Sequence, residues 1–263
     1  MILFVDMEHP QAARRGAPCP GGRRDPEAER AAYIDDVRRR LEACSNDRCV
    51  TRPYWEVTRE WLDAHQPRAL ILGGNVTDWD DYEEARLAPL KEIVTAAALP
   101  VLGLCGGLQF IALAHGVDVR PIRPLAASED DVAADFGDGY LKEWGYTRID
   151  VLFDEDPIFD GLTVGEGSPV FLEAHFCEVK DIPHGFELLA STSTSRVQVL
   201  RRSGTLVYGT QFHPEAYIDE PHDADNCLIR LVYPKGTSGR YPDGRRFLLN
   251  FFRAVEMRIG VTA

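Results

Sequence analysis

Three residues of this sequence have the chemical types and the neighbours that acyl transfer requires. Cys105 stands between the apolar run Leu102-Gly103-Leu104 and the glycine pair Gly106-Gly107, whereas His213 and Glu215 flank a proline near the other end of the chain. A thiolate can attack a carbonyl carbon, an imidazole can move the protons, and a carboxylate can orient the imidazole. We therefore predict Cys105 as the nucleophile, His213 as the general base and acid, and Glu215 as the residue that orients His213.

The segment around Cys105 also predicts how the thiol is presented. An apolar strand leads into Gly-x-Cys-Gly-Gly, and an apolar helix follows. This order predicts a sharp strand-to-helix turn like the nucleophile elbow of serine hydrolases. The helix N-terminus favours the thiolate through its free N–H groups and its partial positive charge. In an open α/β sheet such a turn lies at the carboxyl edge, where ligands bind.

A second glycine pair, Gly73-Gly74, follows the apolar run 69–72 and supplies candidate donors for an oxyanion. We expect the strand formed by this run to lie near the strand that leads to Cys105. The backbone N–H groups of the pair, with that of Gly106, would then stabilise negative charge on the carbonyl oxygen. Removing one such donor typically raises the barrier by about 3 kcal/mol.

The first half of the chain alternates between predicted strands and predicted helices. Short apolar runs predict strands, and apolar residues spaced three or four positions apart predict helices. This order favours an α/β fold, with an open, mostly parallel sheet and helices on both faces. The predicted strands are 2–5, 69–72 and 100–104, and the predicted helices are 27–44, 54–64, 81–98 and 107–115.

The second half changes character. A helix at 244–258 closes the chain, because apolar residues recur there every three or four positions. Before it, short runs separated by turn residues predict five strands that extend the same sheet in antiparallel fashion. These strands are 147–152, 169–173, 186–191, 197–201 and 206–212.

Two segments interrupt the regular plan. Residues 9–26 are rich in Pro, Gly and Arg and predict a long loop, and residues 217–243 predict an irregular insertion. Segments of this length are typical of lids or partner surfaces. No internal repeat or linker divides the sequence, so we treat residues 1–263 as one domain.

The composition narrows the class of protein. Lys and Arg number 29 and Asp and Glu number 42, which gives a net charge of −13. Such a surface repels phosphate backbones and anionic lipid, so we expect neither nucleic acid nor a membrane as a partner. The first residues lack the basic lead of a signal peptide. The six cysteines show no metal-binding spacing, which favours reduced thiols in a cytoplasmic protein without a metal site.

Several segments resemble the class I (triad) glutamine amidotransferase family, and together they cover about residues 1–216. The most specific are GLCGGLQ at 103–109 and YGTQFHPE at 208–215. The others are LILGGNVTDWDDY at 70–82, EWGYTRIDVL at 143–152 and the run from 171 to 202.

The resemblance implies a flavodoxin-like fold and a reaction. In this family a cysteine attacks the side-chain amide of glutamine, ammonia leaves, and a γ-glutamyl thioester is hydrolysed to glutamate. Carried over, Gln109 would help to bind glutamine, and Gly74 and Gly106 would stabilise the oxyanion. No cofactor is implied.

The sequence departs from the family pattern in two places. Asn75 stands where a proline usually follows the glycine pair, and Ala174-His175-Phe176-Cys177 replaces the usual Ser-His-x-Asp. We assign Gly73, Gln109 and His175 to the substrate pocket. The chain has no P-loop and no room for a synthetase, so we expect any ammonia acceptor to bind on another chain.

Three functions stay open at this point. The first is a stand-alone glutaminase subunit that passes ammonia to a partner synthetase or transferase. The second is an autonomous hydrolase of γ-glutamyl amides or peptides, which needs the same thiol chemistry. The third is a non-catalytic scaffold, which is disfavoured because no triad residue is missing.

Overall fold

A computed structural model describes residues 1–11, 26–162 and 167–262. Its centre is an eight-stranded sheet. Five neighbouring strands are parallel: β2 (Cys49–Pro53), β1 (Ile2–Asp6), β3 (Leu70–Leu72), β4 (Val101–Leu104) and β12 (Val207–Thr210). Three more continue the sheet in antiparallel fashion: β11 (Val199–Arg202), β10 (Phe186–Ser191) and β7 (Asp150–Val151). The order across the sheet is β2-β1-β3-β4-β12-β11-β10-β7. The predicted α/β class and the mostly parallel sheet with its antiparallel extension are confirmed.

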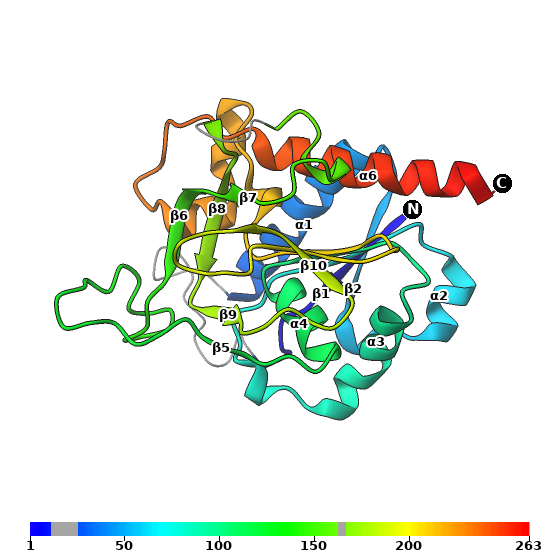
Figure 1. Ribbon diagram of the computed structural model, residues 1–263, viewed down its shortest axis with the longest axis horizontal. Coiled ribbons are helices and arrows are strands. Elements are labelled where there is room, and N and C mark those ends of the chain that lie inside the picture. The colour runs from blue at the N-terminus through cyan, green and yellow to red at the C-terminus, as the bar shows by residue number, and fades with distance from the viewer. Residues whose placement is uncertain (12–25, 163–166, 263) are drawn as a thin grey trace.

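Helices cover both faces of this sheet (Figure 1). Side chains alternate along β1, so Ile2 and Phe4 join one apolar core and Leu3 and Val5 join the other. The first core includes α1 (Pro26–Ser45) and α6 (Asp243–Thr262), which contact each other. The second includes α2 (Arg59–His65), α3 (Glu84–Ala96) and α4 (Gly106–Ala114). Burial on both faces explains why β1, β3 and β4 consist almost entirely of apolar residues.

Two predicted helices are shorter than expected. The segment 54–64 splits into a 3-10 turn, η2 (Tyr54–Glu56), and α2. Thr58 starts α2, because its side chain accepts a hydrogen bond from the Trp61 N–H at 3.3 Å. The segment 81–98 likewise begins with a 3-10 turn, η3 (Trp79–Asp81), before α3.

Two further strand pairs lie outside the main sheet, which corrects the expectation that all the later strands extend it. The strand β6 (Glu143–Arg148) pairs with β8 (Val170–His175), and β5 (Val119–Pro121) pairs with β9 (Cys177–Val179), both antiparallel. The strand β12 does extend the main sheet, but it runs parallel to its neighbour β4 and not antiparallel as expected. This parallel pairing brings the carboxyl ends of β4 and β12 together.

The remaining segments differ from the predictions in detail. The predicted closing helix is α6. The segment 217–243 is less irregular than predicted, since it contains a 3-10 turn, η7 (Pro221–Asp225), and the short helix α5 (Cys227–Val232). Most of the predicted loop 9–26 falls outside the described residues. Two further 3-10 turns are η4 (Pro157–Phe159) and η6 (Pro214–Ala216). Within the described ranges, no helix is long and apolar enough to cross a bilayer.

Candidate active site

Cys105 lies at a strained turn between β4 and α4. Its φ is +50° and its ψ is −102°, a combination that non-glycine residues rarely adopt. Glycines permit the turn, because a Cβ at Gly103 would collide with the backbone of Gly107, and a Cβ at Gly107 would collide with the backbone of Leu72. The turn therefore places the thiol at the carboxyl edge of the sheet and at the N-terminus of α4.

The end of β12 lies next to this turn. Thr210 pairs with Leu104, and the Cys105 N–H donates to the Thr210 carbonyl at 2.7 Å. The side chains of Cys105 and His213 both lie against Gly74. A Cβ built on Gly74 would be 3.1 Å from His213 Cε1 and 3.7 Å from Cys105 Cβ. The structure thus brings together two segments that are far apart in the sequence.

Glu215, on η6, holds one nitrogen of the His213 ring. Its Oε1 accepts hydrogen bonds from His213 Nδ1 at 2.8 Å and from the Tyr33 hydroxyl at 3.3 Å. The His213 side chain is 5% exposed and that of Glu215 is 0% exposed. The Cys105 side chain is close enough to the His213 ring to contribute to its pKa. A carboxylate on Nδ1 leaves Nε2 to exchange a proton with the sulfur.

The charges around His213 favour its protonated form. Burial lowers its pKa, but the negative charges of Glu215 and of the Cys105 sulfur, with their hydrogen bonds, outweigh burial and raise the pKa to about 10. An imidazolium beside a thiolate provides the nucleophile and a proton for the leaving group at once.

The raised pKa of His213 predicts how stability depends on pH. Its stabilising contribution is full below the ordinary value of about 6.5 and is lost as the pH rises towards about 10. We expect the urea midpoint of the wild type to fall over this range. His213→Gln removes this contribution and should flatten the profile. Equal slopes for the two proteins would contradict the prediction.

Gly74 and Gly106 present free backbone donors beside Cys105. Gly106 opens α4, so its N–H has no acceptor within the helix. No residue in the described part of the chain accepts a hydrogen bond from the Gly74 N–H. Gly73 differs, because its N–H donates to the Val5 carbonyl at 3.0 Å and it does not line the cavity beside Cys105.

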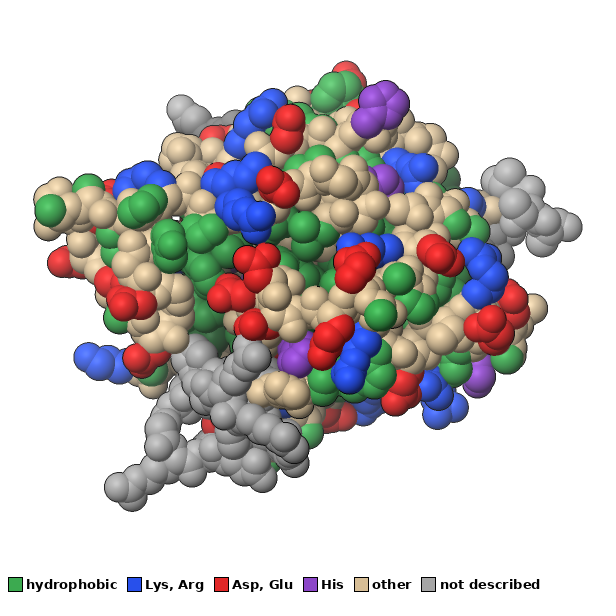
Figure 2. All heavy atoms as spheres, turned by 90° about the horizontal axis from the view of Figure 1, so that it is seen from below, with side chains coloured by type: hydrophobic (Ala, Val, Ile, Leu, Met, Phe, Trp, Pro, Cys, Tyr) green, Lys and Arg blue, Asp and Glu red, His purple; other side chains and the backbone are tan. Residues whose placement is uncertain are grey.

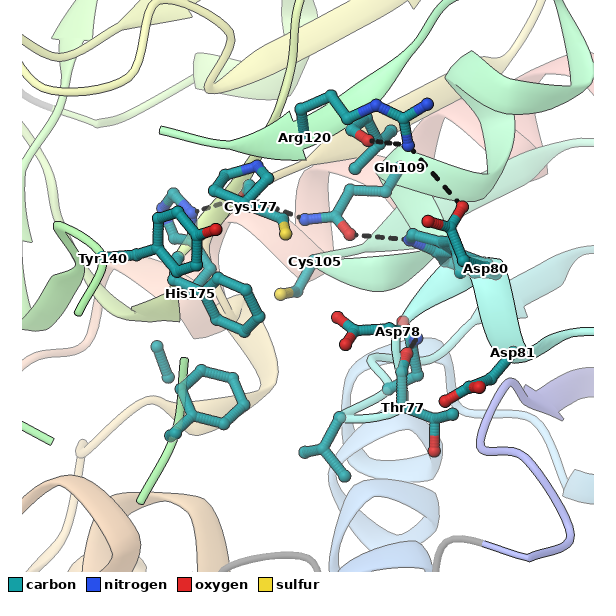
Figure 3. Close-up of a pocket in the computed structure, with 18 residues that line it drawn as sticks. Thr77, Asp78, Asp80, Asp81, Cys105, Gln109, Arg120, Tyr140, His175 and Cys177 are labelled. Carbon is teal, nitrogen blue, oxygen red and sulfur yellow. Dashed lines mark hydrogen bonds and ion pairs between the residues drawn. The ribbon is translucent and has the colours of Figure 1, made fainter. Parts of the chain in front are cut away.

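A cavity of about 370 Å³ opens beside Cys105. In Figure 3 the Cys105 sulfur and the Asp78 carboxylate point into the same open space, and Tyr140 lies on the opposite side from Asp78. Acidic side chains line one side of the cavity and aromatic rings line the other. Figure 2 shows a hollow on one face of the molecule in which apolar side chains gather, with carboxylates beside it. The acidic lining residues are Asp78, Asp80 and Asp81, with Trp79 in the same segment, and the aromatic residues of the other side are Phe136, Tyr140 and Phe176.

The Asp78 carboxylate faces this cavity without a cationic partner among the described residues. Burial, followed by the charges of Asp81 and Asp80, raises its pKa. Arg120, which also lines the cavity, lies 3.6 Å from Asp80. The cavity therefore offers both an unpaired carboxylate and a guanidinium to a ligand.

Gln109 and His175 both line the cavity and are fixed by hydrogen bonds within the protein. Gln109 Oε1 accepts from the Trp79 indole at 2.9 Å, and its Nε2 donates to the Cys177 carbonyl at 3.0 Å. His175 Nδ1 donates to the same carbonyl at 2.9 Å. Neither side chain is a loose surface group.

His175 also lies between two buried carboxyl groups. Its Nε2 is 3.0 Å from Glu143 and 3.2 Å from Glu173. Nδ1 donates to the carbonyl and Nε2 faces two carboxyl groups, an arrangement that favours the imidazolium form of His175. Burial lowers the pKa of His175, but the two carboxyls raise it well above its usual value. Burial raises the pKa of Glu173 to about 7.

These three buried residues are also the one group, within the ranges the structure describes, whose ligand atoms lie close enough to hold a metal ion, all within 4.8 Å of one another. The sequence predicts no metal site. In the structure His175 Nε2 hydrogen-bonds Glu143 Oε2 at 3.0 Å and lies 3.2 Å from the Glu173 carboxyl group.

Three polar residues at the site were not predicted. Gln211 had a signal, because residues two apart in an extended segment share a side and Gln211 precedes His213 by two positions. Asp78 belongs to an acidic run in which no single carboxylate stands out. Tyr33 had no local signal, since it reaches Glu215 from a helix distant in sequence.

The sheet and the strained turn define an open α/β protein that presents a cysteine at a nucleophile elbow. The model of the class-I glutamine amidotransferase family matches residues 31–227. The chain belongs to this family, and the resemblance seen in the sequence is confirmed.

Two curated relatives are GMP synthase proteins. A glutamine-hydrolysing GMP synthase subunit of Thermococcus kodakarensis is 32% identical over 169 residues, 63% of this chain and 75% of that one. The glutamine-hydrolysing GMP synthase of Pectobacterium carotovorum is 31% identical over 183 residues, 68% of this chain but 30% of that one.

Solved structures agree with the fold. A protein described as a GMP synthase subunit from Thermoplasma acidophilum has a TM-score of 0.63 at 22% identity, covering 100% of this chain and 98% of that one. A glutamine amidotransferase from Thermotoga maritima has a TM-score of 0.59 at 14% identity, covering 97% and 98%. At these identities the likeness shows the fold alone.

Proposed function

We propose that the protein hydrolyses the side-chain amide of glutamine and supplies the ammonia to a synthetase or transferase on a separate chain. The observation that carries this proposal is the convergence of Cys105 with the buried His213–Glu215 pair beside a cavity. Family membership and the GMP synthase subunits among the relatives support it. A cytoplasmic location stays part of the proposal, supported by the described cysteines, all of which are free thiols.

In the proposed reaction, His213 takes the thiol proton and the Cys105 sulfur forms a bond to the amide carbon of glutamine. The carbonyl oxygen becomes an oxyanion, which the N–H groups of Gly74 and Gly106 stabilise. The imidazolium returns the proton to the amide nitrogen, the carbon–nitrogen bond breaks, and ammonia leaves. Water, deprotonated by His213, then attacks the thioester, which gives glutamate and restores the thiol.

The charges of the cavity match the far end of glutamine, which carries an ammonium and a carboxylate. We assign the ammonium to Asp78, because this carboxylate has no cationic partner in the described ranges and faces the space in front of Cys105. The α-carboxylate can approach Arg120. Gln109 and His175 form fixed parts of the same wall.

Asp78→Asn is expected to weaken glutamine selectively. A charge-assisted hydrogen bond contributes about 1.5–3 kcal/mol, so KM for glutamine should rise about tenfold or more. Glutaramate, which is glutamine without its amino group, should show no such rise. Steady-state kinetics with both substrates measures the difference, and the exposed Asp63→Asn on α2 serves as the control. An equal rise in KM for both substrates would contradict the assignment of Asp78 to the ammonium group.

The proposed function is tested by measuring ammonia and glutamate released from glutamine. We expect slow release by the protein alone and faster release when its partner chain is added. Steady release that the partner does not change would contradict the coupling. No release under any condition, with Cys105 intact, would contradict glutamine hydrolysis.

An autonomous γ-glutamyl hydrolase is the second candidate. A cavity of about 370 Å³ falls in the range that accommodates ligands larger than glutamine. The aromatic side of the cavity can receive an apolar leaving group. A higher kcat/KM for γ-glutamyl alkylamides than for glutamine would favour this candidate.

A further inference from the structure

The side-chain amide of Gln211 reaches the sulfur of Cys105. Gln211 directly follows β12 and is 0% exposed, and its Nε2 lies 3.5 Å from Cys105 Sγ. The two ends of a carboxamide have the same shape but opposite hydrogen-bonding properties. An N–H facing the sulfur stabilises a thiolate, whereas a carbonyl oxygen there would repel it. The orientation of this amide therefore bears directly on the nucleophile.

The orientation of the Gln211 amide depends on that of Gln109, which is itself fixed by its neighbours. The Trp79 indole nitrogen can only donate, so the atom 2.9 Å from it must be the oxygen of Gln109. The Cys177 carbonyl can only accept, so the atom 3.0 Å from it must be the nitrogen of Gln109. The two neighbours require the same orientation of the Gln109 amide. Rotating this amide by 180° would lose both hydrogen bonds.

Gln109 then fixes the orientation of Gln211. The amide nitrogen of Gln109 is also 3.4 Å from Gln211 Oε1, to which it donates its second hydrogen. The oxygen of Gln211 is thereby directed at Gln109, and its nitrogen faces the Cys105 sulfur. A chain of hydrogen bonds runs from the Trp79 indole through Gln109 and Gln211 to the Cys105 sulfur, and every direction in it is determined by a group that cannot change its role.

We propose that Gln211 is a catalytic residue that donates a hydrogen bond from Nε2 to the Cys105 sulfur and holds it as a thiolate. Gln109 and Trp79 are positioning residues that keep this donor aimed at the sulfur. The thiolate then has two polar partners, the imidazolium of His213 and the amide of Gln211. A negatively charged sulfur gains more from the amide than a neutral thiol does, since hydrogen bonding to the charged form favours that form.

This inference depends on the proposed function only through Cys105 as the nucleophile, and it can be tested without turnover. Iodoacetamide alkylates a thiolate and carries none of the charges of glutamine. The rate of Cys105 alkylation, followed by mass spectrometry of its peptide across pH, gives a midpoint for thiolate formation. The midpoint reports the surroundings of the sulfur even if the protein hydrolyses no glutamine.

Gln211→Met removes the donor at similar volume, and we expect its midpoint to rise by about one pH unit, which is a tenfold change in thiolate population at a given pH. Gln211→Glu should shift the midpoint further in the same direction, because a carboxylate opposes the thiolate. If one variant does not fold, the other still gives the result. With glutamine as substrate, Gln211→Met should lower kcat about tenfold and leave KM unchanged.

Gln198→Met is the matched control. Gln198 is also 0% exposed, and its backbone carbonyl accepts from the Gln211 N–H at 2.9 Å, but its side chain bonds Glu143 instead of the sulfur. We expect it to lose stability like Gln211→Met and to keep the wild-type midpoint. An unshifted midpoint in Gln211→Met, or an equal shift in Gln198→Met, would overturn the proposal.

The positioning residues give a second readout. Trp79→Phe keeps the ring and removes the indole donor, so Gln109 is held less firmly and the alkylation midpoint should rise by less than in Gln211→Met. Gln109→Leu should raise the midpoint as well, because Gln211 loses its anchor. If a Gln109 variant changes KM for glutamine but not the alkylation midpoint, Gln109 contacts the substrate only. This result would refute its proposed role in positioning Gln211.

Discussion

Replacing Cys105 with alanine is expected to abolish the release of ammonia from glutamine while the protein still folds. The loss should be about 10⁴-fold or more, because the other triad members cannot act without the nucleophile. Folding should survive, since the side chain is small and alanine can occupy the same turn. Far-ultraviolet circular dichroism checks the fold, and a coupled glutamate assay measures the activity.

Two further measurements make this result specific. Cys227→Ala, on α5, should keep full activity. An electrophilic glutamine analogue should label Cys105 and not Cys177, although both line the cavity. Burial, and then the charges of Asp78 and Cys105, raise the pKa of Cys177 to about 12, so it stays a thiol. Turnover that persists in Cys105→Ala would contradict Cys105 as the nucleophile.

Gly103→Ala is expected to be the most damaging small substitution in the sheet. Its added Cβ would lie 2.6 Å from the Leu108 nitrogen and against the backbone of Gly107, and neither can move without displacing α4. Such crowding costs about 3 kcal/mol or more, and the displaced turn should remove activity as well. Urea denaturation gives the free energy of unfolding.

Gly204→Ala separates crowding from backbone strain. Gly204 has a φ of +71°, and a Cβ there would meet nothing within 4 Å, so the substitution should cost only about 1 kcal/mol. Equal losses in the two variants would mean that the turn before Cys105 can relax and that its close packing is not essential.

The strand order shows where sequence reasoning succeeds and fails. The strands β1, β3 and β4 were predicted because burial on both faces makes each of them a continuous apolar run. The strand β2 was not predicted, since CVTRP is mostly half-buried and ends in proline, as an edge strand can. The pairing of β6 with β8 was missed because their side chains alone do not reveal which sheet they join.

For the candidate site, too, some features could be predicted from the sequence and others could not. The positions of Cys105, His213 and the free donors followed from local patterns, namely glycines after a strand and a proline after a histidine. The predicted pocket residue Gly73 instead packs behind the site, against Phe4, because its N–H completes the sheet. The partners that determine orientation, such as Tyr33, come from distant elements, and only the folded chain brings them to the site.

The left-handed backbone at Cys105 restricts which nucleophiles this position can accept. A side chain branched at Cβ clashes with the backbone in that conformation more severely than an unbranched one. Threonine is therefore unsuited to this turn, and of the two aliphatic hydroxyl residues only serine fits its geometry. An exchange of the thiol for an aliphatic hydroxyl at this position is therefore limited to Cys105→Ser.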